Sequence, residues 1–521
     1  MERRPPDALD HCEVAFSSVL KEISRKSIGG WILPLAVYLV TRAAAILLIV
    51  PTFDEIGQNY ITNDIAHLVR FPIYFDGQNY MGPLESYVMA PLFRLFGNTY
   101  FHARIYNQIF YLIFAAILLR ILWKRFGQEI AFYALSMLCV LPFTALFFTT
   151  IVGHAEILML AALALQMLLA VAEKPQQSAF PAFGLGLVSG LAFWCYGIFI
   201  IWMLPTALSL FVLCFQGKYP KRILFFSAAG LFAGLIPCAL YFLQTGIFMG
   251  MEGGGGKFIS LSRIPGLVYL CFARLKYFFT SSFISNAPPA VKALNKALSF
   301  YPTAVFLAAF LGGVFYCLRT FRQKNPAEKI LWFYMILPVP ILLVLYSLRD
   351  LTQDEGMRLF LPLLVSFVFF MSVGLKTIKS LALRRLILGG LLGTWLVTDI
   401  FSFQGQALKL REANQIVEFL SQKDLRYGLG DMKISYTLNI LSRGALTVSP
   451  IQPFVRYKPL WEEVETHGAS FFVTDRNGGY SDLLTQSSGL QKQTMGDYEV
   501  FYGPSEGFKA AAYLQDRKIY R

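Results

Sequence analysis

The sequence contains few charged residues for its length. Of its 521 residues, 15% are Asp, Glu, Lys or Arg, 56% belong to the hydrophobic set, and the mean hydropathy is +0.53. Soluble globular domains carry about a quarter charged residues. The composition therefore excludes a soluble globular enzyme.

Motifs for redox chemistry, metal binding and nucleotide binding are also missing. No pair of the seven cysteines has CxxC or metal-ligand spacing, so buried, inert thiols are the default interpretation. The run Gly253 to Gly256 precedes Lys257, but Phe258 stands where a phosphate-binding loop needs Ser or Thr. The first thirty residues are polar and of mixed charge, so no cleavable signal is predicted.

Long apolar runs dominate the first four hundred positions. A run of about twenty apolar residues crosses the hydrocarbon core of a bilayer as one helix. The sequence predicts eleven spans, with 180–215 as two spans joined by a tight hairpin at Tyr196 and Gly197 rather than one re-entrant element. The predicted spans are 31–51, 105–123, 129–148, 155–173, 180–197, 198–215, 223–243, 300–318, 329–347, 359–375 and 384–402.

The net charge of +14 is spread over short turns rather than gathered in one patch, which argues against nucleic acid as a partner. Basic residues in alternate turns place those turns in the cytoplasm. With eleven spans, the N-terminus is then cytoplasmic, and residues 52–104, 244–299 and the C-terminal region lie outside. The basic clusters are those near 21–26, 124–125, 174, 218–222, 319–329 and 376–385.

The last part of the chain is polar enough to form a small separate domain. Ala413, Ile416, Val417 and Leu420 have helical spacing, and 446–449, 471–474 and 498–502 have the composition of short strands. We therefore divide the chain into a transmembrane domain, 1–403, and a soluble periplasmic α/β domain, 404–521.

The first outer loop is rich in carboxylates. Asp54 and Glu55 directly follow the first span, and Asp64, Asp76 and Glu85 come later in the loop. An acid at the hydrocarbon boundary costs free energy that a neutral residue avoids, so Asp54 is a candidate for chemistry. Solvated loop charge is the alternative for Asp64 and Asp76.

Two stretches of this loop have the pattern of helices lying along the membrane surface. In the first, Ile61, Ile65, Leu68 and Val69 form an apolar face, and the second is 84–96.

The order of motifs resembles GT-C membrane glycosyltransferases of the family 39 type, relatives of the protein O-mannosyltransferases and the lipid A aminoarabinose transferase. The resemblance covers most of the chain. It rests on Asp54-Glu55 after the first span, followed by 71–85, Gly153-His154-Ala155-Glu156, 358–362 and Arg456-Tyr457.

The resemblance implies an inverting transfer of a sugar from a polyprenyl-phosphate carrier to a lipid, glycan or protein acceptor on the outer face. Asp54 would be the base that accepts the acceptor's proton, and Glu55 would orient the acceptor or the base. Arg358 would bind the donor phosphate, because an arginine fork meets two phosphate oxygens; a snorkelling anchor is the alternative. Further phosphate contacts are assigned to Lys257, Arg263, Arg274 and Lys276, although a basic loop over anionic lipid is equally consistent. Sugar or acceptor contacts are assigned to Asp76, Gln78, Tyr80, Glu85, His154 and Glu156.

A transporter or lipid flippase is the competing class, and a scaffold for the C-terminal domain is a third. Transporters carry ionisable residues near the membrane midplane. Here the predicted spans contain almost no charge and the acids gather at one surface, which favours surface chemistry on a lipid substrate over passage through the bilayer. The resemblance implies a bacterial inner membrane as the location. The loop acids could hold a divalent ion, but the nearer relatives need none, so no metal or other cofactor is expected.

Overall fold

The computed structural model describes most of the chain. The described residues are 25–76, 78, 80–151, 154–215, 219–246, 278, 293, 297–298, 300–348, 360–451, 457–476, 480–485, 489–504 and 508. Arg358, Lys257, Arg263, Arg274 and Lys276, predicted to bind the donor phosphate, lie outside them.

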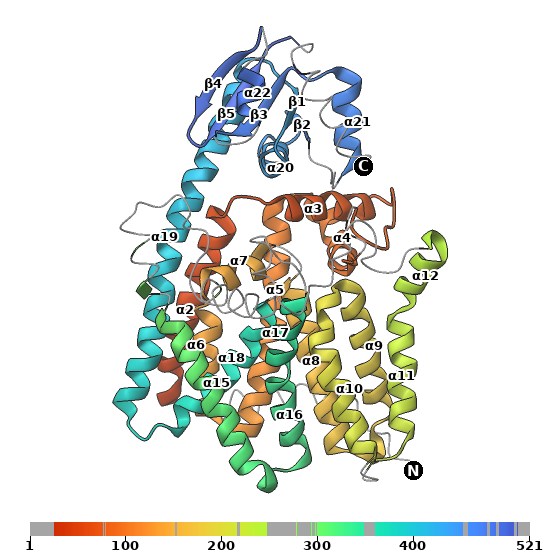
Figure 1. Cartoon of the computed structure of the whole chain (residues 1–521), viewed down its shortest axis with the longest axis vertical. Helices are drawn as coiled ribbons and strands as arrows, with labels where there is room; N and C mark the ends of the chain where they lie inside the picture. Colours follow the sequence, from red (N-terminus) through yellow and green to blue (C-terminus); the bar gives the residue numbers. More distant parts are fainter. Residues whose placement is uncertain are drawn as a thin grey trace, which may run out of the picture.

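The structure is a helical body with a small sheet at one end (Figure 1). This confirms the predicted combination of a polytopic helical part and a C-terminal α/β unit. The helices of the body are α2 (Arg25–Leu48), α5 (Tyr100–Phe126), α6 (Gln128–Cys139), α7 (Phe143–Ile151), α8 (His154–Glu173), α9 (Ala179–Cys195), α10 (Ile200–Phe215), α11 (Arg222–Gly234), α12 (Ile236–Thr245), α15 (Phe300–Thr320), α16 (Pro326–Ile336), α17 (Pro338–Leu348), α18 (Leu361–Thr377) and α19 (Leu381–Gln422).

Each predicted span coincides with one of these helices or with a pair of them. Six helices among the described residues are long and apolar enough to cross a membrane alone, and up to eight spans result if each bent pair counts as one. The pairs α6–α7 and α11–α12 bend by 77° and 48°. The range 180–215 is two helices, separated by extended backbone at Tyr196. The total of eleven spans stays a prediction.

Local signals explain where individual helices begin and end. Thr99 accepts a hydrogen bond from the His102 backbone at the start of α5, and Gly127 ends that helix with a φ of 89°. In the most apolar 18-residue segment of each helix, 72% of α8 is buried inside the protein, whereas 17% of α15 is. The α8 helix is therefore central, and α15 exposes its apolar surface as a lipid-facing helix does.

The helices α9 and α11 pack with their backbones in direct contact. Gly186 and Gly190 face Gly230 and Gly234, and a Cβ atom at any of the four would collide with backbone of the other helix. This is the GxxxG type of packing that apolar membrane helices use, since small residues let two backbones approach closely.

The predicted spans hold several ionisable residues, and two of them, Arg42 and Asp399, are electrostatic neighbours inside the helical body. Arg42 of α2 and Asp399 of α19 are 3% and 1% exposed. The Arg42 guanidinium donates to the hydroxyls of Thr149 and Thr150 in α7, and Asp399 is one of its electrostatic neighbours. These charges are internal to the bundle, which is the usual way that membrane helices accommodate them.

The first outer loop forms α3 (Phe53–Ala66) and α4 (Leu84–Phe96), and α3 lies across the end of the helical body beneath the sheet (Figure 1). The second predicted helix, 84–96, is confirmed with its boundaries, and its place along the membrane surface stays a prediction. The first begins earlier and ends earlier than predicted: Leu68 and Val69 follow its end and are 67% and 70% exposed. Ile61 and Ile65 are buried in the protein core, because protein covers both sides of α3.

The C-terminal sheet has five strands in the order β2-β1-β3-β5-β4. Strand β1 pairs with β2 and β3 in parallel, and β5 pairs with β3 and β4 antiparallel. The predicted strands are β2 (Thr447–Pro450), β3 (Phe471–Asp475) and β5 (Tyr498–Tyr502). The strands β1 (Tyr427–Gly430) and β4 (Gln491–Met495) were not predicted, because β1 is half glycine and β4 is an almost wholly polar edge strand. The helices of this region are α20 (Met432–Leu441), α21 (Lys458–His467) and α22 (Ser481–Thr485).

The sheet is attached to the body by one long helix and by contacts with α3. The predicted C-terminal helix is the end of α19, whose 42 residues span about 63 Å. The proposed boundary between 403 and 404 falls inside this helix and stays a prediction. At α3, Ile56 packs with Tyr436 and Leu460, and the Thr437 hydroxyl donates to the Pro51 carbonyl oxygen at 2.9 Å.

A buried ion pair joins α2, α3 and α5. Glu55 accepts from Arg104 at 2.6 Å (Oε1 to Nε) and 2.8 Å (Oε2 to Nη2), and both side chains are fully buried. Arg104 Nη1 also donates to the carbonyl oxygens of Ile46 and Ile49 at the end of α2. Glu55 completes a capping box with Thr52. One carboxylate therefore starts α3 and fastens it to two spans.

Removing one partner of this pair should destabilise the protein strongly. Arg104→Met leaves Glu55 buried without its counter-charge, which should cost about 3–5 kcal/mol, and adding Glu55→Gln should recover part of that loss. Thermal unfolding in detergent measures both. The matched control is Lys458→Met, since Lys458 and Glu462 form an exposed pair worth at most about 1 kcal/mol. Equal losses for Arg104→Met and the control would contradict the assigned role of the pair.

Candidate active site

Asp54 lies in the first turn of α3, directly after the Thr52 cap. Its side chain is half-buried, and its Oδ1 accepts a hydrogen bond from Gln78 Nε2 at 3.3 Å. The positive end of a helix dipole stabilises a negative side chain at this position. Glu55, the next residue, points the other way, into the ion pair with Arg104. Two adjacent acids thus have different surroundings, one buried and paired, the other at the edge of α3.

Gln78 is held toward Asp54 by a closed turn of the outer loop. The Phe75 amide donates to the Met81 carbonyl oxygen, and the amides of Gln78 and Met81 donate to Phe75 and Gln78. Gln78 is 4% exposed. Arg70, which precedes the turn, forms an ion pair with Asp76 of the turn, with Nη2 and Oδ2 2.8 Å apart. Tyr80 is half-buried beside them.

The turn is fastened to the end of α9. The Gly82 amide donates to the carbonyl oxygens of Trp194 and Cys195, and the Trp194 indole donates to the Ile73 carbonyl oxygen at 2.9 Å. A Cβ atom at Gly82 would collide with the Trp194 ring, so only glycine allows this approach.

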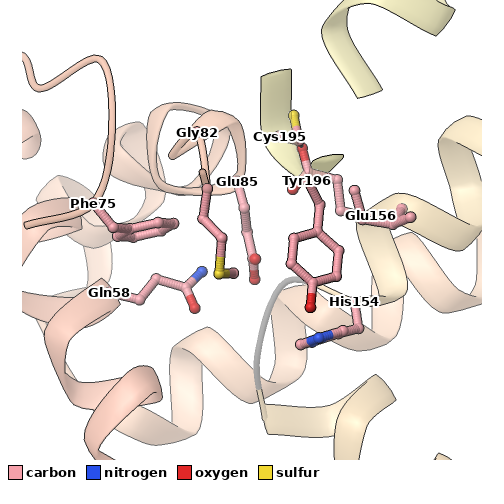
Figure 2. A pocket seen from close by; sticks show the side chains of 10 residues that line it. Gln58, Phe75, Gly82, Glu85, His154, Glu156, Cys195 and Tyr196 are labelled. Carbon is pink, nitrogen blue, oxygen red and sulfur yellow. The ribbon is translucent and has the colours of Figure 1, made fainter. Parts of the chain in front are cut away.

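A pocket lies between α3, α4, α8 and the end of α9 (Figure 2). Figure 2 shows Gln58 and Glu85 on one side of Tyr196 and Glu156 on the other, with the His154 ring below the Tyr196 hydroxyl. The rings of Tyr196 and His154 meet edge to face with centroids 5.4 Å apart. The lining residues are Gln58, Phe75, Met81, Gly82, Glu85, His154, Glu156, Ile157, Cys195 and Tyr196.

Two buried carboxylic acids face this pocket. Glu85 is 2% exposed and Glu156 4%. The Cys195 thiol donates to Glu156 Oε1 at 3.7 Å, and Glu85 Oε1 has no hydrogen-bond partner among the described residues. Among the residues that the structure describes, those that line the pocket include neither lysine nor arginine. The pocket therefore offers buried hydrogen-bonding groups, which suit the recognition of hydroxyl-bearing ligands.

Burial changes the protonation of Glu85. It raises the pKa of Glu85 to about 8, against the opposing effect of the Gln58 and Asn107 side chains that face the carboxylate. At neutral pH Glu85 is therefore mostly a neutral acid, which can donate a hydrogen bond as well as accept one.

The structure brings together some of the residues predicted from sequence and separates others. Glu85, His154 and Glu156 line one pocket, and Gln78 contacts Asp54. Asp76 pairs with Arg70, and Glu55 with Arg104. The described residues contain no group of three or more His, Cys, Asp or Glu that could hold a metal. The expectation of no cofactor stays a prediction.

Several residues of the site were not assigned a role from sequence. Gln58 lies one helical turn after Asp54, so helical spacing could have identified it. Tyr196 was placed at a hairpin, which gave no indication that its ring lines a pocket. Arg104 finds its acid only through the fold, since it is 49 residues away from Glu55. Arg70 is six residues from both Asp64 and Asp76, a spacing that does not by itself indicate a contact.

Comparison with known proteins is consistent with this architecture. Residues 81–242 match the family model described as dolichyl-phosphate-mannose-protein mannosyltransferase. A search among curated proteins found no significant match.

Two solved structures of ArnT from Cupriavidus metallidurans are similar over nearly the whole chain. The apo structure has a TM-score of 0.58 at 12% identity, covering 92% of this chain and 99% of ArnT. The structure bound to undecaprenyl phosphate has a TM-score of 0.55 at 12% identity, covering 91% and 98%. The chain is thus a multi-pass membrane protein with the fold seen in the ArnT structures, and the predicted resemblance is confirmed.

Replacing Glu85 by glutamine should change how stability depends on pH. The folded protein keeps a proton on Glu85 that the unfolded chain loses near pH 4.5, so its stability falls as the pH rises from about 4.5 to 8. Glu85→Gln has no proton to lose, so its melting temperature relative to wild type should be higher at pH 8 than at pH 5. The control is Glu465→Gln, at an exposed position. A difference between Glu85→Gln and wild type that stays constant with pH would show that Glu85 is ionised in the folded protein.

Proposed function

We propose that the protein is an inverting glycosyltransferase that moves a sugar from a polyprenyl-phosphate carrier to an acceptor on the periplasmic face of the inner membrane. The observation that carries the proposal is the placing of Asp54 in the first turn of a rigidly anchored helix at the end of an ArnT-like body. The match of residues 81–242 to a mannosyltransferase family and the ArnT structure with undecaprenyl phosphate support the reaction class and the donor.

Asp54 is the proposed base. An inverting transfer needs one group that takes the proton from the attacking acceptor while the carrier phosphate leaves from the opposite face of the sugar. Gln78 holds Asp54 Oδ1 by a hydrogen bond, which fixes the rotation of the carboxylate. Glu55, bound to Arg104, fixes the backbone of α3 from which Asp54 projects. Glu55 thereby orients the base without itself contacting the substrates.

Glu85, His154 and Glu156 are the proposed sugar or acceptor contacts, in the pocket beside the 75–81 turn. The neutral acid form of Glu85 suits a hydroxyl ligand, because it both donates and accepts a hydrogen bond. Asp76, Gln78 and Tyr80, in the 75–81 turn, are further proposed sugar or acceptor contacts.

The departing phosphate needs cations at the level of the lipid headgroups. Arg358 is proposed for this role, with Lys257, Arg263, Arg274 and Lys276 as further contacts. The proposal for these five rests on their chemistry and on their place in the sequence. It also assumes a cytoplasmic N-terminus and a C-terminal region outside, as the basic turns predict.

Asp54→Asn tests the central claim. The amide keeps the shape of the side chain but cannot accept the proton, so turnover should fall by at least about 10²-fold. We would express the wild type or the variant in cells that lack the protein, extract lipids, and measure polyprenyl-phosphate-linked sugars by mass spectrometry. The donor that accumulates without the protein should disappear with wild type and persist with Asp54→Asn.

The control for this experiment is Asp482→Asn, an exposed acid of the C-terminal region. It should restore the lipid profile of wild type. Near-normal turnover of purified Asp54→Asn, with the accumulated lipid as donor, would assign the base to another acid. A lipid profile that is the same with and without the protein would contradict the transferase itself.

Arg358 variants test the phosphate contact. Arg358→Ala should weaken the use of the donor by about ten- to a hundred-fold, as expected for the loss of a charge-assisted hydrogen bond, and Arg358→Lys should weaken it less. Donor affinity and turnover in detergent measure both effects, with the melting temperature as control. Unchanged kinetics beside a lowered melting temperature would make Arg358 a structural anchor.

A further inference from the structure

The C-terminal region contacts the first outer loop through Tyr457. The Tyr457 ring stacks on Tyr60 of α3, with centroids 4.4 Å apart and planes 12° from parallel. Its hydroxyl donates to Asp64 Oδ1 at 3.3 Å. Burial, with Asp64 nearby, raises the pKa of Tyr457 to about 12, so the hydroxyl keeps its proton at working pH. The contact joins residues 393 positions apart in the sequence.

Asp64 is also bound by Arg70, which continues the connection toward the 75–81 turn. Arg70 Nε and Asp64 Oδ2 are 2.7 Å apart, and Arg70 Nη2 and Asp76 Oδ2 are 2.8 Å apart. The guanidinium lies over the Tyr457 ring, 5.6 Å from its centroid. Arg70 thereby ties the last turn of α3 to the turn that carries Gln78.

This set of contacts ends at Asp54. Tyr457 binds Asp64, Arg70 joins Asp64 to Asp76, and Gln78 in the same turn donates to Asp54 Oδ1. The beginning of α3 is anchored by Arg104, and its last turn is held by Tyr457 and Arg70. An ion pair as exposed as that of Arg70, whose side chain is 34% exposed, contributes little alone. The stacked ring and its hydroxyl supply the additional constraint.

We propose that Tyr457 is a positioning residue, through which the C-terminal region holds the outer loop in the arrangement that presents Asp54 for reaction. This rests on the proposed role of Asp54 as base. It explains why α3 lies between the helical body and the sheet: the loop is fixed from both sides (Figure 1).

Hydrogen exchange tests the structural part without any assay of transfer. Tyr457→Phe keeps the stack on Tyr60 and removes only the hydroxyl. In the purified full chain, backbone amides of 53–66 and 75–81 should exchange about 2- to 10-fold faster in this variant, as expected for the loss of one hydrogen bond. Tyr457→Ala should increase exchange further. The matched control is Tyr427→Phe, because Tyr427 stacks on His467 within the C-terminal region; it should leave both segments unchanged.

Kinetics test the functional part. With the lipid that accumulates in cells lacking the protein as donor, Tyr457→Phe should lower kcat about 3- to 10-fold with KM for the donor nearly unchanged, since fewer molecules present the base correctly. The double variant, with both Tyr457→Phe and Asp64→Asn, should have the same kcat as the single variant Asp64→Asn. Both substitutions break the same connection, so their effects should not add.

The outcomes separate the two proposals. If the exchange rates and the kcat of Tyr457→Phe matched those of the Tyr427→Phe control, the role of Tyr457 would be overturned. The same holds if the kcat losses of the two single variants multiply in the double variant. Absence of transfer by wild type would contradict the proposed function. The exchange rates would then still decide whether Tyr457 holds the loop.

Discussion

The buried ion pair between Glu55 and Arg104 is the constraint on which the first outer loop depends. A charge inside a membrane protein is tolerated only where an opposite charge and hydrogen bonds compensate its desolvation. Arg104 provides this compensation and also binds the carbonyl oxygens at the end of α2. Because Glu55 is part of the capping box of α3, the same pair sets where α3 begins. Asp54, one residue earlier, is thereby placed at the junction of loop and bundle.

The rest of the site depends on how the first outer loop folds back over the Glu55–Arg104 pair. The 75–81 turn brings Gln78 to Asp54, and the contact of Gly82 with Trp194 presses the start of α4 against α9. Glu85, in the first turn of α4, is carried into the pocket opposite Glu156. Packing among apolar helices then removes water from both acids, which makes their protonation and hydrogen bonding differ from those of exposed carboxylates. The C-terminal region closes this arrangement from the other side.

Much of the architecture could be predicted from sequence because its causes are local. Apolar runs long enough to cross a bilayer indicate the helices, and short runs rich in β-branched and aromatic residues indicate β2, β3 and β5. The boundaries of α4 follow from its apolar face. The acid-rich loop and the motif order pointed to the fold type that the comparison with ArnT confirmed. Strand β1 is half glycine and strand β4 is almost wholly polar, so their strand character depends on neighbours in the sheet.

Only the tertiary structure decided how the charged residues are used. In the sequence, Asp54, Glu55, Asp64, Asp76 and Glu85 are five similar acids of one loop. In the fold, Glu55 is paired with a residue 49 positions away, Glu85 is buried in a pocket, and Asp64 is bound by Arg70 and by Tyr457. Burial and partners arise from contacts between distant segments, and neither periodicity nor composition encodes which segments meet. The sequence by itself thus determined a helical membrane protein with an acidic outer loop and a small C-terminal sheet, whereas packing decided which acid is an anchor, which lines the pocket and which remains at the edge of α3.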